Sequence, residues 1–217
     1  MHIVFAKCVK TKVYDYDCFV AEQTKIVEAN PDDVAAYIYR GLIYMGRDLD
    51  RAIADYNRVL ELDQLYEPAY MSLAAAYNRK GDYVWALTYL NRGLELFPDS
   101  AQFYAFRGSV YLKQREFGKA LADFNKVIEL SPESDDGFIG RANLYTAQGD
   151  LDKALAEYDK AIGVNPRYWR NYYDRGFIYW GRGDKAKAGA DCQQAKELKR
   201  YERRIPPEHI SNEYCSL

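Results

Sequence analysis

Residues 101–134 read AQFYAFRGSVYLKQREFGKALADFNKVIELSPES, and the next stretch of equal length repeats their landmarks. The shared landmarks are an arginine before a small residue, then a tyrosine, an alanine and a proline. They stand at Arg107, Gly108, Tyr111, Ala120 and Pro132 in the first copy and at Arg141, Ala142, Tyr145, Ala154 and Pro166 in the second. Every landmark lies 34 residues from its counterpart. Self-similarity at a fixed period of this length indicates a repeat protein.

The same period extends in both directions along the chain. Pro98 precedes Pro132 by 34 residues, and Pro31 precedes Pro98 by 67, because the first unit is one residue shorter. The period therefore defines five units, at 34–66, 67–100, 101–134, 135–168 and 169–202. Before Pro31, four residues near one helical face indicate the second helix of an eroded unit: Phe19, Gln23, Ile26 and Val27.

Each unit has the pattern of two helices joined by a short turn. Apolar residues recur at helical spacing in both halves of a unit. Between the halves, Gly-Asp steps such as Gly81-Asp82 and Gly149-Asp150 interrupt the pattern. Glycine accepts the left-handed conformation that ends a helix, and aspartate caps the free N–H groups of the next helix. The proline then closes the unit because it cannot continue a helix. We therefore predict a helix, a turn and a second helix in every unit.

These landmarks, in register over five units, resemble the tetratricopeptide repeat family. The resemblance implies an all-α fold, a right-handed α-solenoid of stacked antiparallel helix pairs whose first helices line a concave surface. It implies a degenerate N-terminal repeat or cap at 1–33, a five-repeat domain at 34–204 that ends in an extended capping helix, and a tail at 205–217. Basic side chains are expected to give that helix a polar outer face: Lys196, Lys199, Arg200, Arg203 and Arg204.

Composition and charge exclude several functional classes. The 217 residues include 30 basic and 32 acidic side chains, a formal net charge of -2, which disfavours a dedicated nucleic-acid binder. Hydrophobic content of 48% is too high for a disordered chain. The two histidines, His2 and His209, leave little for a histidine-based triad or zinc site. Without phosphate-binding glycine motifs or a nominated catalytic pair, we expect no enzyme activity, no cofactor and no metal.

The four cysteines are scattered and form no Cys-x-x-Cys pair. They are too few for a disulfide framework in a chain of this length, so we expect a reduced, cytoplasmic protein. Cys192 occupies a slot that other units fill with Tyr56, Leu90 or Phe124, and it is expected to be a small apolar filler. The N-terminal apolar run is too short for a signal peptide, and no stretch of about 18 apolar residues predicts membrane insertion.

An arginine and an acid occupy matching positions in four of the five units. The pairs are Arg40 with Asp55, Arg107 with Asp123, Arg141 with Glu157 and Arg175 with Asp191. The unit that lacks the arginine lacks the acid too, and has Leu73 and Tyr89 instead. This joint presence and absence predicts an ion pair between the two helices of a unit. The alternative, a row of arginines that binds phosphates, is disfavoured because each arginine is accompanied by its own acid.

Repeat register assigns a candidate peptide-binding groove to the exposed face of the first helices. Its residues are Met71, Asn78, Arg79, Gln102, Ser109, Lys113, Ile139, Asn143, Arg170, Tyr173 and Phe177. Tyr173 and Phe177 have an alternative role, as packing residues under the terminal helix. Most of the 21 tyrosines fall on recurring slots, which makes them scaffold residues whose hydroxyls reach water or a neighbouring helix.

Family members that hold acidic chaperone C-termini use a two-carboxylate clamp of lysine, asparagine and arginine. The matching positions here lack that set, and Asp174 brings the wrong charge to one of them. We therefore expect a non-catalytic interaction scaffold or adaptor that binds a partner protein or peptide in the groove. The alternatives are a self-associating assembly protein that uses its terminal helices, a homo-oligomer, and, ranked last, an RNA-binding helical repeat.

Overall fold

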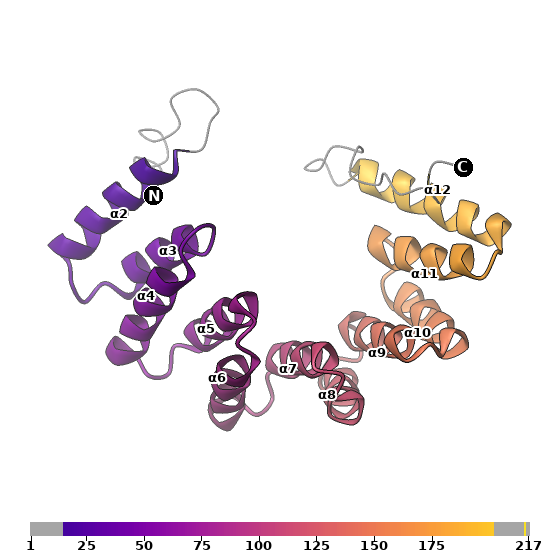
Figure 1. The fold of residues 1–217 in the computed structure, drawn as a ribbon, viewed down its shortest axis with the longest axis horizontal. Coiled ribbons are helices and arrows are strands. Elements are labelled where there is room, and N and C mark those ends of the chain that lie inside the picture. The colour runs from indigo at the N-terminus through magenta and orange to yellow at the C-terminus, as the bar shows by residue number, and fades with distance from the viewer. Residues whose placement is uncertain (1–14, 202–214, 216–217) are drawn as a thin grey trace. The chain divides into compact units, whose positions relative to one another are not determined.

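The computed structural model describes residues 15–201 and Cys215, and within 15–201 the chain consists of helices joined by short turns and loops (Figure 1). The described helices are α2 (Tyr16–Ala29), α3 (Val34–Tyr44), α4 (Leu49–Leu62), α5 (Glu67–Lys80), α6 (Tyr83–Leu96), α7 (Ala101–Lys113), α8 (Phe117–Leu130), α9 (Asp136–Gln148), α10 (Leu151–Val164), α11 (Trp169–Gly181) and α12 (Lys185–Tyr201). Helices α3 to α12 form five consecutive antiparallel pairs, so the expected all-α repeat fold is confirmed.

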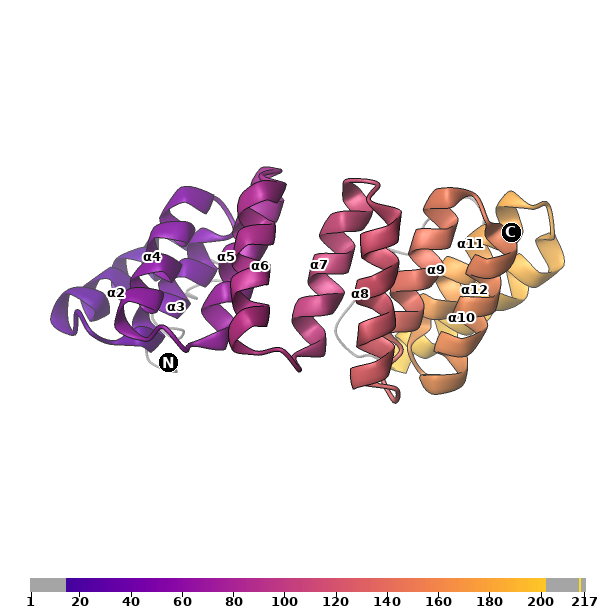
Figure 2. The ribbon, with the colours of Figure 1, turned by 90° about the horizontal axis from the view of Figure 1, so that it is seen from below.

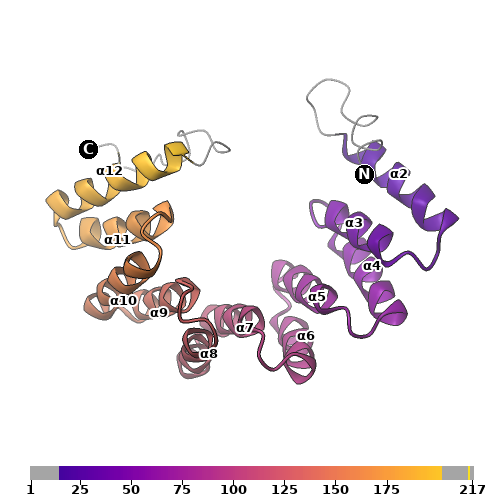
Figure 3. The ribbon, with the colours of Figure 1, turned by 180° about the vertical axis from the view of Figure 1, so that it is seen from behind.

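The chain also divides into two larger compact units, each of which contains several repeat units. The boundary between them falls inside α7. Below, 'first unit' and 'second unit' refer to these two. The first unit extends to Phe103 and holds α2 to α6 with the first residues of α7, while the second begins at Tyr104. Within the second unit α7 and α8 run side by side (Figure 2), and α11 lies between α10 and α12 (Figure 3).

The Gly-Asp steps end one helix and begin the next, as predicted. Gly81 and Gly149 have φ angles of 79° and 82°, in the left-handed region that a residue with a Cβ rarely adopts. The Asp82 carboxylate accepts a hydrogen bond from the Trp85 amide at 3.2 Å. Asp150 accepts one from the Lys153 amide at 3.3 Å. Each turn thus satisfies backbone groups on both of the helices that it joins.

Small residues let the two helices of a pair approach closely. A Cβ on Gly41 of α3 would lie 2.5 Å from Cε1 of Tyr56 on α4, and a Cβ on Gly108 of α7 would lie 2.8 Å from Cε1 of Phe124 on α8. Tyr56 and Phe124 are themselves buried. The small-residue slot therefore sets the helix spacing, and the aromatic residue fills the space beside it.

Tyrosines in one recurring slot also hold the loops that precede three of the repeat units. The hydroxyl of Tyr70 donates to the Gln64 carbonyl at 2.9 Å, and that of Tyr172 donates to the Pro166 carbonyl at 3.1 Å. Tyr37 makes the same bond to Pro31 at 3.2 Å. Gln64 replaces the proline of the other units, yet its carbonyl serves the same role. These tyrosines are scaffold residues, as expected.

The four intra-repeat ion pairs are present. Arg40 donates to Asp55 through Nε at 2.9 Å and through Nη2 at 2.6 Å, and Arg107 binds Asp123 in the same way at 2.9 and 2.7 Å. Arg141 donates twice to Oε2 of Glu157. The acids are Asp55, Asp123, Glu157 and Asp191, and all four are buried. The arginines thus stabilise the scaffold and are not available to bind phosphates.

Two of these arginines also connect successive helix pairs. Arg141 donates through Nη1 to Asn125 on α8 at 3.0 Å, in addition to its bonds to Glu157 on α10. Arg175 donates to Asp159 on α10 at 2.6 Å. One guanidinium therefore joins three helices, which suits its planar array of five donors.

One described helix, α2, precedes the five pairs, and the last helix of the fifth pair, α12, is the longest of those described. The N-terminal helix α2 buries Phe19, Gln23 and Val27 along one face, on the segment where the sequence indicates an eroded repeat. The last helix α12 runs to Tyr201. Arg203, Arg204 and most of the expected tail lie outside the described residues.

Candidate functional site

All the residues assigned to the candidate groove stand on first helices. In the first unit α5 carries Met71, Asn78 and Arg79, and Gln102 opens α7. In the second unit Ser109 and Lys113 lie on α7, Ile139 and Asn143 on α9, and Arg170, Tyr173 and Phe177 on α11. They are exposed or partly exposed, but several have partners within the repeat scaffold.

Arg79 and Asn143 serve the scaffold as well as the surface. Nη1 of Arg79 donates to the backbone carbonyl of Met45, which caps the end of α3. Oδ1 of Asn143 accepts from the Tyr158 hydroxyl on α10 at 2.7 Å. Burial raises the pKa of Tyr158, so this hydroxyl stays protonated and remains a donor. Substituting either groove residue would therefore disturb the joint between helices.

The groove residues on α11 differ in exposure. Tyr173 packs edge-on against Trp169, with ring centroids 6.0 Å apart, and contacts a cluster that contains Ala188 and Cys192. Packing against the terminal helix, the alternative role for Tyr173, is therefore part of its environment. Phe177 stacks on Trp180 at 6.1 Å yet keeps 49% of its surface exposed. Phe177 is thus a large apolar side chain of α11 that remains exposed.

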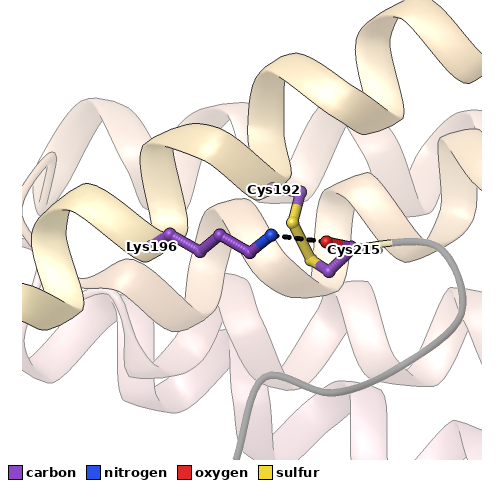
Figure 4. Close-up of a disulfide and its surroundings, with 3 residues drawn as sticks. All are labelled: Cys192, Lys196 and Cys215. Carbon is purple, nitrogen blue, oxygen red and sulfur yellow. Dashed lines mark hydrogen bonds between the residues drawn. A yellow bond between two sulfur atoms is a disulfide. The ribbon is translucent and has the colours of Figure 1, made fainter. Parts of the chain in front are cut away.

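A disulfide links Cys192 on α12 to Cys215, with the Cα atoms 5.5 Å apart (Figure 4). The expectation that Cys192 is an unpaired apolar filler is therefore wrong, although the residue is buried as the slot requires. Cys18 is disulfide-bonded as well. The expectation of a chain with reduced cysteines fails at these positions.

The basic residues near the end of α12 do not all face solvent. Lys199 is only 4% exposed, and its Nζ lies 4.7 Å from the centroid of the Trp169 ring, close enough for a cation–π contact. Lys196 donates to the backbone carbonyl of Cys215 (Figure 4). The expected polar cap is therefore wrong for Lys199, which packs onto α11, and Lys196 helps to hold Cys215 in place.

A cavity of about 300 Å³ opens between the N-terminal halves of α9 and α11. Its lining comes from α9, from the loop before α11 and from α11 itself: Asp135, Asp136, Ile139, Asn165, Tyr168, Arg170, Asn171 and Asp174. Two predicted groove residues, Ile139 and Arg170, are among them. The cavity holds three carboxylates and one guanidinium, so its surface is predominantly acidic.

The deepest side chains of this cavity are only partly satisfied. Asn171 is 1% exposed and Asp135 is 8% exposed. Nδ2 of Asn171 donates to Oδ2 of Asp135 at 2.7 Å, whereas Oδ1 of Asn171 has no hydrogen-bond partner among the described residues. A buried polar atom without a partner is uncommon in native structures and calls for an explanation.

Among the described residues, Arg170 is the one cation within 4.0 Å of the Asp174 carboxylate. Nε of Arg170 lies 4.0 Å from Oδ2 of Asp174, and the Arg170 side chain is largely exposed. Burial raises the pKa of Asp174 to about 6, and the charge of Arg170 offsets this rise only in part. Asp174 is therefore a carboxylate whose charged form would gain from an additional positive group.

Register could have identified part of this cavity. Asn171 stands in a slot that Ala36, Ala69, Phe103 and Gly137 occupy in the other units. A lone polar side chain in a buried apolar slot is a signal of a special site, because burying it costs free energy unless it is paired. No comparable pattern in the sequence marks Asp135, whose role depends on its hydrogen bond to Asn171.

The described residues contain neither a metal-binding cluster nor a membrane-spanning helix. No group of three or more histidine, cysteine, aspartate or glutamate side chains there is placed to hold a metal ion. None of the helices described is long and apolar enough to cross a membrane.

Family comparisons agree with the repeat register. A tetratricopeptide repeat model matches residues 24–67 and 73–135, a TPR repeat model matches 142–183, and a further tetratricopeptide repeat model matches 170–202. The chain belongs to the tetratricopeptide repeat family.

Several solved structures share this fold. A tetratricopeptide repeat protein from Parabacteroides merdae is 22% identical with a TM-score of 0.69, and the match covers 85% of this chain and 78% of that one. MamA is 26% identical with a TM-score of 0.58, over 73% and 92% of the two chains. YrrB, described as a TPR protein with an unusual peptide-binding site, is 23% identical with a TM-score of 0.53, over 86% and 96%. No curated protein sequence matches the chain significantly.

Proposed function

We propose that the chain is a non-catalytic scaffold or adaptor that binds a partner polypeptide on the exposed face of its first helices. One observation carries the proposal. The first helices α9 and α11 together line a cavity, and α11 presents the exposed ring of Phe177 one turn beyond Asp174. A concave, partly apolar surface with a few polar groups is the common form of a ligand site.

The family and its relatives support this function at the level of the class. The chain is built of tetratricopeptide repeats, and the structural neighbour YrrB is described as having a peptide-binding site. The mode of binding differs from that of the two-carboxylate clamp, because Asp174 occupies a position where the clamp places a cation. An acidic C-terminal peptide is therefore a poor ligand for the second unit.

A sharp test uses exposed apolar residues that are not part of the intra-repeat ion pairs. Ile139→Ala combined with Phe177→Ala should weaken the affinity for a peptide selected on the wild-type chain by about tenfold or more. Val84→Ala is the matched control, because Val84 is 71% exposed but lies on α6, a second helix. Equal affinities of the double variant and the wild type, by fluorescence anisotropy, would exclude the first-helix surface.

Self-association is the second candidate. Val84 and Trp85 are neighbouring exposed apolar residues on α6, and such side chains can mark a contact between copies. Light scattering over a dilution series decides between the two functions. A monomer at every concentration removes self-association, whereas a concentration-dependent dimer that Trp85→Ala abolishes would support it.

RNA binding remains last among the candidates. A helical repeat that binds RNA needs a basic surface, and the cavity on the second unit has three carboxylates against Arg170.

The cytoplasmic location also stays a prediction. The Cys192–Cys215 disulfide argues against it, because disulfides persist mainly in oxidising compartments.

A further inference from the structure

The cavity between α9 and α11 is lined by a buried amide oxygen and by carboxylates that could accept further hydrogen bonds and pair with a cation. Asn171 is almost completely buried, and its Oδ1 accepts no hydrogen bond from any residue that the structure describes. Asp135 accepts one bond from Asn171, and the one described cation beside Asp174 is Arg170, with Nε 4.0 Å from Oδ2. These acceptors come from two different helices and line the same cavity.

We propose that this cavity receives the ammonium group of a lysine side chain from a partner polypeptide. An ammonium carries three donors and no acceptor, which matches an unpaired carbonyl oxygen and two under-neutralised carboxylates. Its hydrogen bonds to carboxylates would be charge-assisted and therefore among the stronger ones. The inference rests on the proposed peptide-binding function and names the side chain that the partner contributes.

The rest of the surface suits a polypeptide better than a free small amine. Ile139 lines the cavity beside the acids and can contact the methylene groups of a lysine. Phe177 lies three residues after Asp174 on α11, on the same helical face, and offers an exposed ring for a neighbouring apolar residue of the partner. A volume of about 300 Å³ accommodates one side chain and not a large cofactor.

Arg170 is the feature that tunes this site. Its guanidinium lies at the edge of the cavity, exposed, and it faces the Trp169 ring at 5.8 Å from Cζ to the centroid. Because its guanidinium lies 4.0 Å from the Asp174 carboxylate, it neutralises that charge only in part, and a second cation can still gain from pairing with Asp174. An Arg170→Ala variant should therefore bind a lysine probe more tightly, because a competing positive charge is removed.

The test is an NMR titration of the full chain with a single side-chain probe. Nα-acetyl-lysine N-methylamide should shift the side-chain amide signals of Asn171 saturably, and its norleucine analogue, which has no charge, should bind at least about tenfold more weakly. Asp174→Asn should reduce the lysine affinity by a similar factor. Glu133→Gln is the matched control, because Glu133 is exposed and lies outside the cavity lining.

The outcomes separate this inference from the proposed function. Equal titration by the lysine and norleucine probes, or wild-type lysine affinity in a folded Asp174→Asn protein, overturns the ammonium site. A displayed peptide library supplies the second arm. Enrichment of lysine-containing peptides that lose affinity for Asp174→Asn supports the inference. Enriched peptides without a basic residue, insensitive to that substitution, overturn it and leave peptide binding intact. Failure to enrich any peptide contradicts peptide binding itself, and with it a polypeptide as the occupant.

Discussion

Arg175 on α11 grips Asp191 on α12 through two hydrogen bonds, 2.8 Å from Nε to Oδ2 and 2.6 Å from Nη2 to Oδ1. The same guanidinium donates to Asp159 on α10 at 2.6 Å. Asp191 is buried, and the Arg175 side chain is mostly buried. Because α10, α11 and α12 meet at this one arginine, it connects the last helix pair to the pair before it.

Arg175→Leu should therefore destabilise the chain strongly. Removing one partner of a buried pair leaves the Asp191 charge uncompensated, a loss of roughly 3–5 kcal/mol in comparable cases. Arg182→Leu is the control, because its pair with Asp152 is exposed and such pairs contribute about 0–1 kcal/mol. Urea denaturation of both variants checks the difference. Similar unfolding midpoints for the two proteins would contradict the structural role assigned to Arg175.

A substitution at Gly140 on α9 tests how closely α9 packs against α8. A Cβ at this position would fall on the ring of Phe124, which is buried in the core of the second unit. Gly140→Ala should cost about 1–3 kcal/mol, because the ring must move from a packed position. Gly189→Ala on α12 has open space around it and should instead stabilise the helix by up to about 1 kcal/mol. Opposite shifts of the melting temperature are the expected result.

The repeat fold was predictable because its determinants recur. The Gly-Asp turns, the small residues and the ion pairs each appear several times in register, and the one unit with Leu73 in place of arginine also lacks the acid. Such joint variation of two positions indicates from the sequence alone that the two residues are in contact. The candidate groove residues were assigned from the same register, which does not indicate their hydrogen bonds. Nothing in a helical period indicates that Arg79 reaches the Met45 carbonyl of the preceding unit.

The disulfide and the cavity lay beyond the reach of the pattern. Cys192 and Cys215 are 23 residues apart, and Cys215 lies past the last repeat, where no period places it. Cysteine spacing alone does not determine pairing. Asn171 was recognisable as polar in an apolar slot, but its free Oδ1 depends on where Asp135 lies. A repeat pattern does not indicate contacts of this kind, because they do not recur from one repeat unit to the next.

Removing the Cys192–Cys215 bond should weaken the C-terminal part of the second unit. A bond that closes a loop of this length is worth about 3 kcal/mol in the chain-entropy treatment. The double substitution Cys192→Ala and Cys215→Ala isolates it, because a reductant would also open the bond at Cys18. Calorimetry should show a lower melting temperature for the double variant. Reactive thiols at both positions in the denatured, unreduced wild type would refute the bond itself.

The stability of the second unit should depend on pH through Asp174. Its pKa is about 6 in the folded chain, against an ordinary value near 3.8, so the folded state holds this proton more tightly than the unfolded state does. The stabilisation is therefore complete below about pH 4 and is lost as the pH rises through about 6. The charged groups around the carboxyl are Arg170 on α11 and, across the cavity, Asp135 and Asp136.

Asp174→Asn removes this dependence because an amide does not ionise. The variant should exceed the wild type in free energy of unfolding at about pH 7.5, by up to about 3 kcal/mol, and the gap should close toward pH 4. Glu133→Gln, which changes the net charge equally at an exposed position, should follow the wild-type curve. Urea titrations at several pH values measure all three proteins. Parallel curves for Asp174→Asn and wild type would show that the carboxyl is ordinary, and that the cavity does not disfavour its charge.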